Sequence, residues 1–245
     1  MATIERRTNE RVLRIADTAE ELAHAVAESL ADRMLQILQW QPRFSLVLSG
    51  GKTPRLLYHL LATEYRQRIN WNRVHLFWSD DRYVPHDHPA SNFRMVCEML
   101  TDPLNLPLEN IHPMPTDAPD PDDAARLYEA QLRHFFGGFP RFDFILLGMG
   151  ADGHTASLFP GTSALQERKR WVAVGEAPVE PRVRLTLTLP VLNAAQAVHF
   201  LVADADKAET VRRILVENAP LPAALVLPDH GELVWWLDKD AASGI

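Results

Sequence analysis

The sequence predicts an α/β fold of three layers, Rossmann-like in arrangement, with a mainly parallel central sheet covered by helices on both faces. Short apolar segments alternate along the chain with longer segments whose apolar residues recur every three or four positions, the spacing of an amphipathic helix. The short segments, such as 44–48 and 197–202, are almost entirely apolar, which is typical of parallel strands buried on both faces. Residues 1–245 are expected to form a single domain, with the Pro/Asp-rich stretch 112–123 as a surface loop within it.

The first predicted elements are a strand at 12–16 and a helix that extends to about Gln39. Thr18 and Glu21 resemble a capping box at the start of this helix. Leu22 begins an apolar stripe at helical spacing, which is expected to pack on the sheet. The further predicted elements are a strand at 44–48, a helix from Pro54, a strand at 74–78, helices from about Ser91 and at 121–136, strands at 142–147, near 171–174, near 184–188 and at 197–202, a helix at 205–217, and strands at 223–227 and 232–237.

Charge and composition exclude several classes of function. The net charge is −7 and no Lys/Arg-rich run interrupts it, so nucleic acid is not expected as a partner, whereas an anionic small molecule would need cations in its pocket. No apolar segment is long enough to span a bilayer, so no membrane role is expected. The single cysteine, Cys97, excludes an internal disulfide, and the first residues lack the apolar core of a signal peptide. We therefore expect a cytoplasmic protein, either a monomer or a small homo-oligomer.

Polar loops follow several predicted strands, at the carboxyl ends where open α/β sheets bind ligands. The first, at 49–54, reads Ser-Gly-Gly-Lys-Thr-Pro. Its glycines let backbone N–H groups face outward, and its proline suits the first turn of a helix. Such a helix start attracts anions, phosphate above all. It is not a Walker loop, which requires a glycine where this chain has Leu46. A plain glycine turn is the alternative, although the lysine and threonine favour the anion site.

The second loop, at 79–92, begins with carboxylates beside an arginine: Asp80, Asp81 and Arg82. Carboxylates next to a guanidinium can orient a polyol and bind an anion. A surface network of ion pairs, with Ser91 as a helix cap, is the alternative. A metal site built from the two histidines of this loop is disfavoured because no third histidine lies nearby.

The third loop, at 148–161, formally contains the dinucleotide pattern G-x-G-x-x-G in Gly148, Gly150 and Gly153. A dinucleotide fold needs a crossover helix after this pattern, but Pro160 and the glycine after it leave room for only about two helical turns. NAD is therefore not expected as a cofactor.

His154 lies in this third loop beside Asp152, where an imidazole can reach a substrate and be oriented by a carboxylate. That arrangement suits a general base, although a structural histidine is the alternative. No G-x-S-x-G elbow is present, so a serine hydrolase is not expected. Later in the chain, Arg184 and Lys207 either are solvated surface charges or add to a positive pocket for an anion.

Together and in this order, the loops resemble those of the 6-phosphogluconolactonase family, within the superfamily that includes the glucosamine-6-phosphate isomerases. The likeness spans about residues 10–240, and the stretch 148–161 is its most specific part. The resemblance implies an α/β fold shared with the amino-sugar phosphate deaminases, and hydrolysis of 6-phospho-D-glucono-1,5-lactone in the pentose phosphate pathway. The motifs that carry it are SGGKTP at 49–54, DDRYVPHDHPASN at 80–92, GMGADGHTASLFPG at 148–161, RLTLT at 184–188, LNAA at 192–195 and DADKAE at 204–209.

The resemblance also implies roles for individual residues. The first loop would hold the substrate phosphate, while Asp80 would contact sugar hydroxyls or order its loop. His154 would take a proton from water, and Asp152 would hold the imidazole; no metal or cofactor is required. Where the family often has Asp-Glu-Arg, this chain has a second aspartate, Asp81, whose side chain is shorter than that of a glutamate. The candidate catalytic residues are His154 and Asp152, and the candidate substrate and phosphate ligands are Ser49, Gly50, Gly51, Lys52, Thr53, Asp80, Arg82, Arg184 and Lys207.

Two other functions remain open. A glucosamine-6-phosphate deaminase resembles this protein in fold and in two of the loops, but its motif continues with a glutamate where this chain has Phe159. A non-catalytic sugar-phosphate sensor would need a DNA-reading module, and the stretch of about ten residues before the first predicted strand is too short for a helix-turn-helix.

Overall fold

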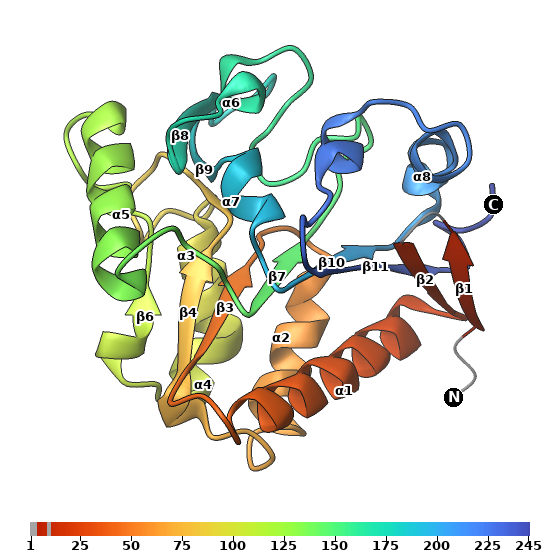
Figure 1. The fold of residues 1–245 in the computed structure, drawn as a ribbon, viewed down its shortest axis with the longest axis horizontal. Coiled ribbons are helices and arrows are strands. Elements are labelled where there is room, and N and C mark those ends of the chain that lie inside the picture. Colours follow the sequence, from red (N-terminus) through yellow and green to blue (C-terminus); the bar gives the residue numbers. More distant parts are fainter. Residues whose placement is uncertain (1–3, 9–10) are drawn as a thin grey trace.

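The computed structural model describes residues 4–8 and 11–245 and confirms the three-layer α/β architecture (Figure 1). One large sheet of eight strands runs through its centre. Its strands are β1 (Ile4–Thr8), β2 (Arg11–Ala16), β3 (Phe44–Leu48), β4 (Val74–Trp78), β6 (Ile111–His112), β7 (Phe144–Leu147), β10 (Ala197–Val202) and β11 (Glu232–Asp238).

The strands lie in the order β1-β2-β11-β10-β7-β3-β4-β6. Every neighbouring pair is parallel except β1–β2 at one edge, which is antiparallel, so the predicted mainly parallel sheet is confirmed. From β3 the chain adds β4 and β6 toward one edge; it then returns to β7 and adds β10 and β11 toward the other. The direction of winding therefore reverses between β3 and β7, and in open α/β sheets ligands bind at such a point.

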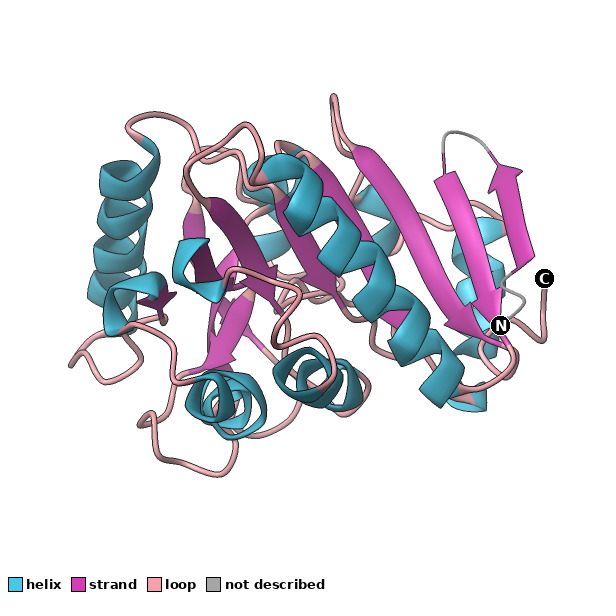
Figure 2. Cartoon of the chain, turned by 90° about the horizontal axis from the view of Figure 1, so that it is seen from below, coloured by secondary structure: helices cyan, strands magenta, loops and turns pink. Residues whose placement is uncertain are grey.

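Helices cover both faces of this sheet, as expected. Because crossovers between parallel strands are right-handed, the reversal of winding places the later helices on the opposite face from the earlier ones, and Figure 1 shows α1 and α2 below the sheet with α7 and α8 above it. Figure 2 shows α1 lying along one face. The helices are α1 (Ala19–Ile37), α2 (Pro54–Thr63), α3 (Asn92–Val96), α4 (Asp102–Leu104), α5 (Pro121–Phe136), α6 (Ser163–Gln166), α7 (Leu189–Asn193) and α8 (Ala208–Leu215), with a π-helical turn at Cys97–Thr101 and 3-10 turns at Trp71–Arg73, Leu108–Asn110, Ala205–Lys207 and Pro222–Leu225.

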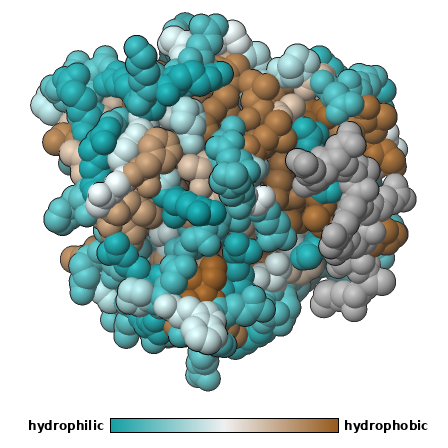
Figure 3. All heavy atoms as spheres, in the orientation of Figure 1, coloured by the Kyte–Doolittle hydropathy of each residue, from teal (hydrophilic) through white to brown (hydrophobic). Residues whose placement is uncertain are grey.

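Local signals start α1 as predicted. The Thr18 hydroxyl accepts a hydrogen bond from the Glu21 N–H at 3.1 Å, and the Glu21 carboxylate accepts one from the Asp17 N–H at 3.2 Å, which satisfies two backbone donors at the helix start. The apolar stripe that begins at Leu22 is buried against α2, β2 and β11. The opposite side of α1 is polar, and hydrophilic residues cover most of the face drawn in Figure 3.

The core lies on both faces of the central strands. Trp78, Phe144 and Phe200 are fully buried, and Trp235 stacks on Phe200 with ring centroids 4.2 Å apart. Removing each of these side chains from water contributes roughly 2–3 kcal/mol. The central strands can therefore hold the polar loops at their carboxyl ends in fixed positions.

A second, smaller sheet was not expected. It contains β5 (Asp80–Arg82), β9 (Val183–Leu187) and β8 (Val172–Glu176), all antiparallel. The strands predicted near 171–174 and 184–188 are thus confirmed, but they lie in this sheet rather than in the central one. The segment at 80–82, expected to be loop, is the strand that pairs with β9.

One predicted strand, 223–227, is wrong. The segment forms a 3-10 turn at Pro222–Leu225, although its apolar residues resemble a short strand. They are apolar because they pack under the third loop, where the Ala223 N–H donates to the Gly153 carbonyl at 2.9 Å. The predicted helix at 205–217 is confirmed as a 3-10 turn followed by α8.

Asp81 connects the small sheet to α3. One carboxylate oxygen accepts from the N–H groups of Arg82 and Asn92, both at 2.7 Å, and the other from the Phe93 N–H at 2.9 Å and the Ser91 hydroxyl at 3.3 Å. Burial raises the pKa of Asp81 to about 6, and these N–H donors oppose a larger rise. Asp81 therefore holds the loop in place and does not reach the pocket described below.

Asp81→Asn should lower the free energy of unfolding by about 2 kcal/mol at pH 8, because an amide NH₂ would then face two of these donors. Denaturant unfolding measures the change. Asp87→Asn, which alters an exposed carboxylate in the same loop, is the matched control and should stay within about 0.5 kcal/mol of the parent. Equal effects of the two substitutions would contradict this role of Asp81.

Candidate active site

The loop after β3 presents unpaired backbone N–H groups. Tyr58 of α2 is buried and fixes the start of the loop, since its hydroxyl accepts from the Ser49 N–H at 3.1 Å and donates to the Ser49 carbonyl at 2.7 Å. Gly51 has a φ of +105°, which side-chain-bearing residues rarely adopt. The N–H groups of residues 50–53 have no hydrogen-bond partner within the described part of the chain. Because α2 begins at Pro54, they form an anion-attracting helix start.

Close packing joins this loop to the second one. A Cβ on Gly50 would lie 1.9 Å from Oδ1 of Asn92, so only glycine fits there. The Asn92 side chain in turn donates to the Asp80 carbonyl at 3.0 Å. Glycine is therefore needed at the first glycine position of the SGGKTP motif because the second loop packs against it, as well as because of the turn.

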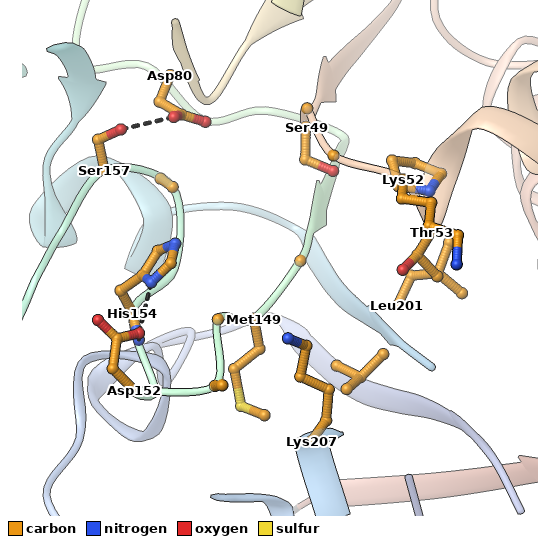
Figure 4. A pocket seen from close by; sticks show the side chains of 18 of the residues that line it. Ser49, Lys52, Thr53, Asp80, Met149, Asp152, His154, Ser157, Leu201 and Lys207 are labelled. Atoms are coloured by element: carbon orange, nitrogen blue, oxygen red, sulfur yellow. Dashed lines mark hydrogen bonds and ion pairs between the residues drawn. The ribbon is translucent and has the colours of Figure 1, made fainter. Parts of the chain in front are cut away.

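His154 and Asp152 form a pair in the loop after β7 (Figure 4). The His154 Nδ1 lies 2.5 Å from the Asp152 carboxylate, which also accepts from the His154 backbone N–H at 3.1 Å. Partial burial works to raise the pKa of Asp152, but these hydrogen bonds and the ring's charge outweigh it and hold the pKa below its usual value. Because Nδ1 faces the carboxylate, Nε2 is the ring nitrogen left to meet a ligand.

Glycines make room for this pair. A Cβ on Gly150 would lie 2.1 Å from the His154 ring and 2.7 Å from the Asp152 carboxylate. Gly153 has a φ of +82°, and a Cβ there would lie 2.8 Å from the Leu221 side chain. The pattern that formally matches a dinucleotide fingerprint therefore accommodates a histidine and a turn. No long crossover helix follows it, because the chain continues into α6 and the small sheet.

Asp80 faces the same pocket from β5. Its carboxylate accepts from the Ser157 hydroxyl at 2.6 Å, drawn as a dashed line in Figure 4, and from the Ser79 hydroxyl at 3.1 Å. Asp80 is buried, but these hydroxyls satisfy its oxygens. Asp80 therefore faces the pocket, whereas Asp81 binds the backbone N–H groups at the start of α3.

Arg82 and Arg184 lie opposite each other on β5 and β9. Arg82 donates to the Ala90 carbonyl at 2.6 Å. The Nε atoms of both arginines are buried without a hydrogen-bond partner, and neither side chain forms an ion pair with another described residue. Burial, and then the charge of Arg82, lowers the pKa of Arg184, of which only 5% is exposed. Two adjacent guanidinium groups without a carboxylate partner attract an anion.

Two lysines complete the set of cations. Lys207 points into the pocket past Met149 in Figure 4, and its Nζ lies 2.7 Å from Asp206. The Lys52 Nζ lies 3.8 Å from Asp204 and its side chain is 88% exposed. Both lysines therefore keep a carboxylate neighbour, in contrast to the arginines.

All of these groups line one cavity of about 680 Å³ at the reversal between β3 and β7. Every residue predicted from the sequence as catalytic or substrate-binding lies on its wall; the set is Ser49, Gly50, Gly51, Lys52, Thr53, Asp80, Arg82, Asp152, His154, Arg184 and Lys207. The cavity combines a histidine–carboxylate pair, unpaired N–H donors and four cationic side chains. Such a site can bind a phosphorylated ligand and activate a water molecule beside it.

Several lining residues were not predicted. Ser157 belongs to the third loop, and its hydroxyl orients Asp80. Phe159 packs on His154 with ring centroids 4.3 Å apart. Val179 and Asp204 also line the cavity. Val179 reaches it through the connection between β8 and β9, where no motif was noted. Asp204 reaches it through the turn after β10; it begins the DADKAE motif, but no role was predicted for it.

Neither a metal site nor a membrane span is found in the described ranges. Among residues 4–8 and 11–245, no three His, Cys, Asp or Glu side chains are grouped so as to hold a metal ion. The His86 ring instead lies 2.9 Å from the Met114 carbonyl oxygen. In the same ranges no helix has the length and apolar character needed to cross a membrane.

Known proteins share both the sequence and the fold. The 6-phosphogluconolactonases of Synechocystis sp. and Nostoc sp. are 47% and 44% identical over 208 and 213 residues, which cover 82% and 84% of this chain and 84% and 86% of theirs. The crystal structure of 6-phosphogluconolactonase from Thermotoga maritima superposes with a TM-score of 0.83 at 33% identity, covering 94% of this chain and 100% of that one.

A more distant structure shares the fold alone. A monomeric glucosamine-6-phosphate deaminase superposes with a TM-score of 0.79 at 24% identity, covering 95% of this chain and 99% of that chain. The model of the family described as glucosamine-6-phosphate isomerases/6-phosphogluconolactonase matches residues 17–235. The chain therefore belongs to the 6-phosphogluconolactonase family within that group.

Proposed function

We propose that this protein hydrolyses 6-phospho-D-glucono-1,5-lactone to 6-phosphogluconate, the second step of the oxidative pentose phosphate pathway. The observation that carries the proposal is the single cavity in which a histidine–aspartate pair faces anion-binding groups. The name of a relative that is 47% identical, the 6-phosphogluconolactonase of Synechocystis sp., supports the same reaction.

The phosphate of the substrate would bind at the loop after β3. The unpaired N–H groups of residues 50–53 would donate hydrogen bonds to the phosphate oxygens, and no side chain has to be ordered for this. Lys52 and Lys207 would add positive charge beside the phosphate. Arg184 would add a guanidinium whose Nε has no partner in the described chain. These local cations explain how a protein of net charge −7 holds an anion.

The lactone carbon would lie at the other end of the cavity, beside His154. Nε2 of His154 takes a proton from water as the water oxygen attacks C1, and N–H donors of the glycine-rich loop after β7 stabilise the oxyanion. When the tetrahedral intermediate collapses, the bond from C1 to the ring oxygen breaks, and His154 returns its proton to that oxygen. Asp152, held ionised by its hydrogen bonds, fixes the imidazole and stabilises the imidazolium. Asp80 would accept hydrogen bonds from sugar hydroxyls.

The amino-sugar phosphate deaminase reaction is less compatible with this site. It requires a proton to move between carbon atoms, and its motif supplies for this a glutamate five residues after the histidine, in addition to the aspartate that precedes it. The position where the deaminase motif carries that glutamate is Phe159, which packs on His154. An apolar ring beside the base fits an ester hydrolysis that needs only one base.

The wild-type protein should accelerate proton release from freshly generated 6-phosphogluconolactone far above the spontaneous rate, and should act on unphosphorylated gluconolactone much more weakly. His154→Ala should lose at least about 100-fold in kcat because the general base is removed. A pH-indicator assay at mildly acidic pH, where spontaneous hydrolysis is slow, measures both.

The control for His154 is His134→Ala, which removes an exposed histidine of α5 and should leave the rate unchanged. If the wild type does not exceed the spontaneous rate, the lactonase proposal fails. If His154→Ala keeps full activity, the reaction stands but the base is another group.

Gly150→Ala should reduce kcat by about tenfold or more, because its Cβ would collide with the His154 ring and displace the catalytic pair. Gly148→Ala is the matched control in the same loop: a Cβ there meets no atom within 4 Å. Steady-state kinetics, with circular dichroism to check folding, compare the two variants. Equal losses of kcat in the two variants would contradict this explanation. They would mean that a side chain anywhere in the loop lowers kcat, whether or not it displaces His154.

A further inference from the structure

Asp204 has an unusual backbone conformation at the edge of the candidate active site. Its φ is 80° and its ψ is 145°, a combination close to the region that is essentially restricted to glycine. Residues held in such conformations cluster at functional sites, where the surrounding structure compensates for the strain. Asp204 lines the cavity, so its carboxylate lies near any ligand bound there.

The strained turn is firmly held. The Asp204 N–H donates to Oδ2 of Asp238 at 3.1 Å, and Asp238 is itself buried and accepts from the Ala241 N–H at 2.8 Å. The Asp204 carbonyl accepts from the Lys207 N–H at 3.1 Å. The conformation is therefore set by contacts on both sides of the residue, and it directs the carboxylate toward the mouth of the cavity.

The carboxylate of Asp204 meets Lys52 across that mouth, with Oδ2 and Nζ 3.8 Å apart. Lys52 belongs to the loop whose N–H groups have no partner in the described chain, and it forms no other ion pair there. An anion bound at this loop would approach the same ammonium group. The turn after β10 and the loop after β3 thus place a carboxylate where a phosphate would compete with it.

We propose that Asp204 tunes the affinity of the site for phosphate: its carboxylate competes with the phosphate of the ligand for Lys52 and thereby limits how tightly the cavity holds anions. The inference rests on the proposed function of the site. A phosphate oxygen that accepts a hydrogen bond from Lys52 would lie within about 7 Å of the Asp204 carboxylate. At this distance, repulsion in a solvated site weakens binding of a phosphate dianion by about two- to tenfold at moderate ionic strength.

This competition has a use in turnover. The phosphate is present in both the substrate and the product, so every contact that holds it also holds the product after ring opening. Without the carboxylate of Asp204, Lys52 would bind the phosphate of the product more tightly and slow its release. Binding that does not favour the transition state does not help kcat, and a carboxylate beside Lys52 reduces such binding.

Two substitutions separate the charge of Asp204 from its backbone strain. Asp204→Asn removes the charge and keeps a side chain, whereas Asp204→Gly removes the charge and relieves the strain. In calorimetric titrations with 6-phosphogluconate and with inorganic phosphate, both variants should bind about two- to tenfold more tightly than the wild type. In thermal unfolding without ligand, only Asp204→Gly should gain stability, by about 2–4 °C in Tm.

The Lys52→Gln background tests whether the competition acts through Lys52. There, Asp204→Asn should tighten binding much less than in the wild type. Unchanged or weaker binding in Asp204→Asn, or equal tightening with and without Lys52, would overturn the proposal. Binding of inorganic phosphate requires no turnover, so these results are independent of whether the wild type hydrolyses the lactone, which the assay above decides.

Discussion

The parallel pairing of β3 with β7 is the constraint on which the candidate site depends. The two strands are neighbours in register at Leu46–Phe144 and Val47–Ile145. Below them, buried Asp143 accepts from the Ser45 N–H at 2.8 Å and the Ser45 hydroxyl at 2.6 Å. Because the chain leaves β3 toward one edge of the sheet and β7 toward the other, no crossover covers their carboxyl ends. The loop after β3 and the histidine loop after β7 therefore open into one cavity, although about a hundred residues separate them in sequence.

The small sheet completes that cavity and determines its charge. Pairing of β5 with β9 brings Arg82 beside Arg184, which repel each other unless an anion lies between them. The lysines behave differently, because each keeps an aspartate neighbour. Asp80 and Asp81 lie near enough to act on the charge of Arg184, but neither forms an ion pair with it. The cavity therefore presents arginines without an ion pair to any described residue on one wall, and lysines that each have one elsewhere on its wall.

Much of this could be predicted from the sequence, because the signals are local. The cap at Thr18, the apolar strands and the polar loops that follow them identify the fold class and the residues that line the cavity. The pairing of 80–82 with β9 could not be predicted, since it depends on contacts between distant segments. The apolar segment 223–227 is buried by a loop rather than by a sheet, so its apolar composition wrongly predicted a strand. The strain at Asp204 has no sequence signal, because only glycine marks such a conformation.

A crystal structure with bound 6-phosphogluconate would test this assignment of the site most directly. In it, the phosphate should accept hydrogen bonds from the N–H groups of residues 50–53, and the carboxylate carbon should lie within reach of Nε2 of His154. A phosphate placed beside His154, with the carboxylate at the first loop, would contradict the assignment of the two ends of the cavity. A product molecule bound outside the cavity would contradict the central claim that the reversal between β3 and β7 forms the active site.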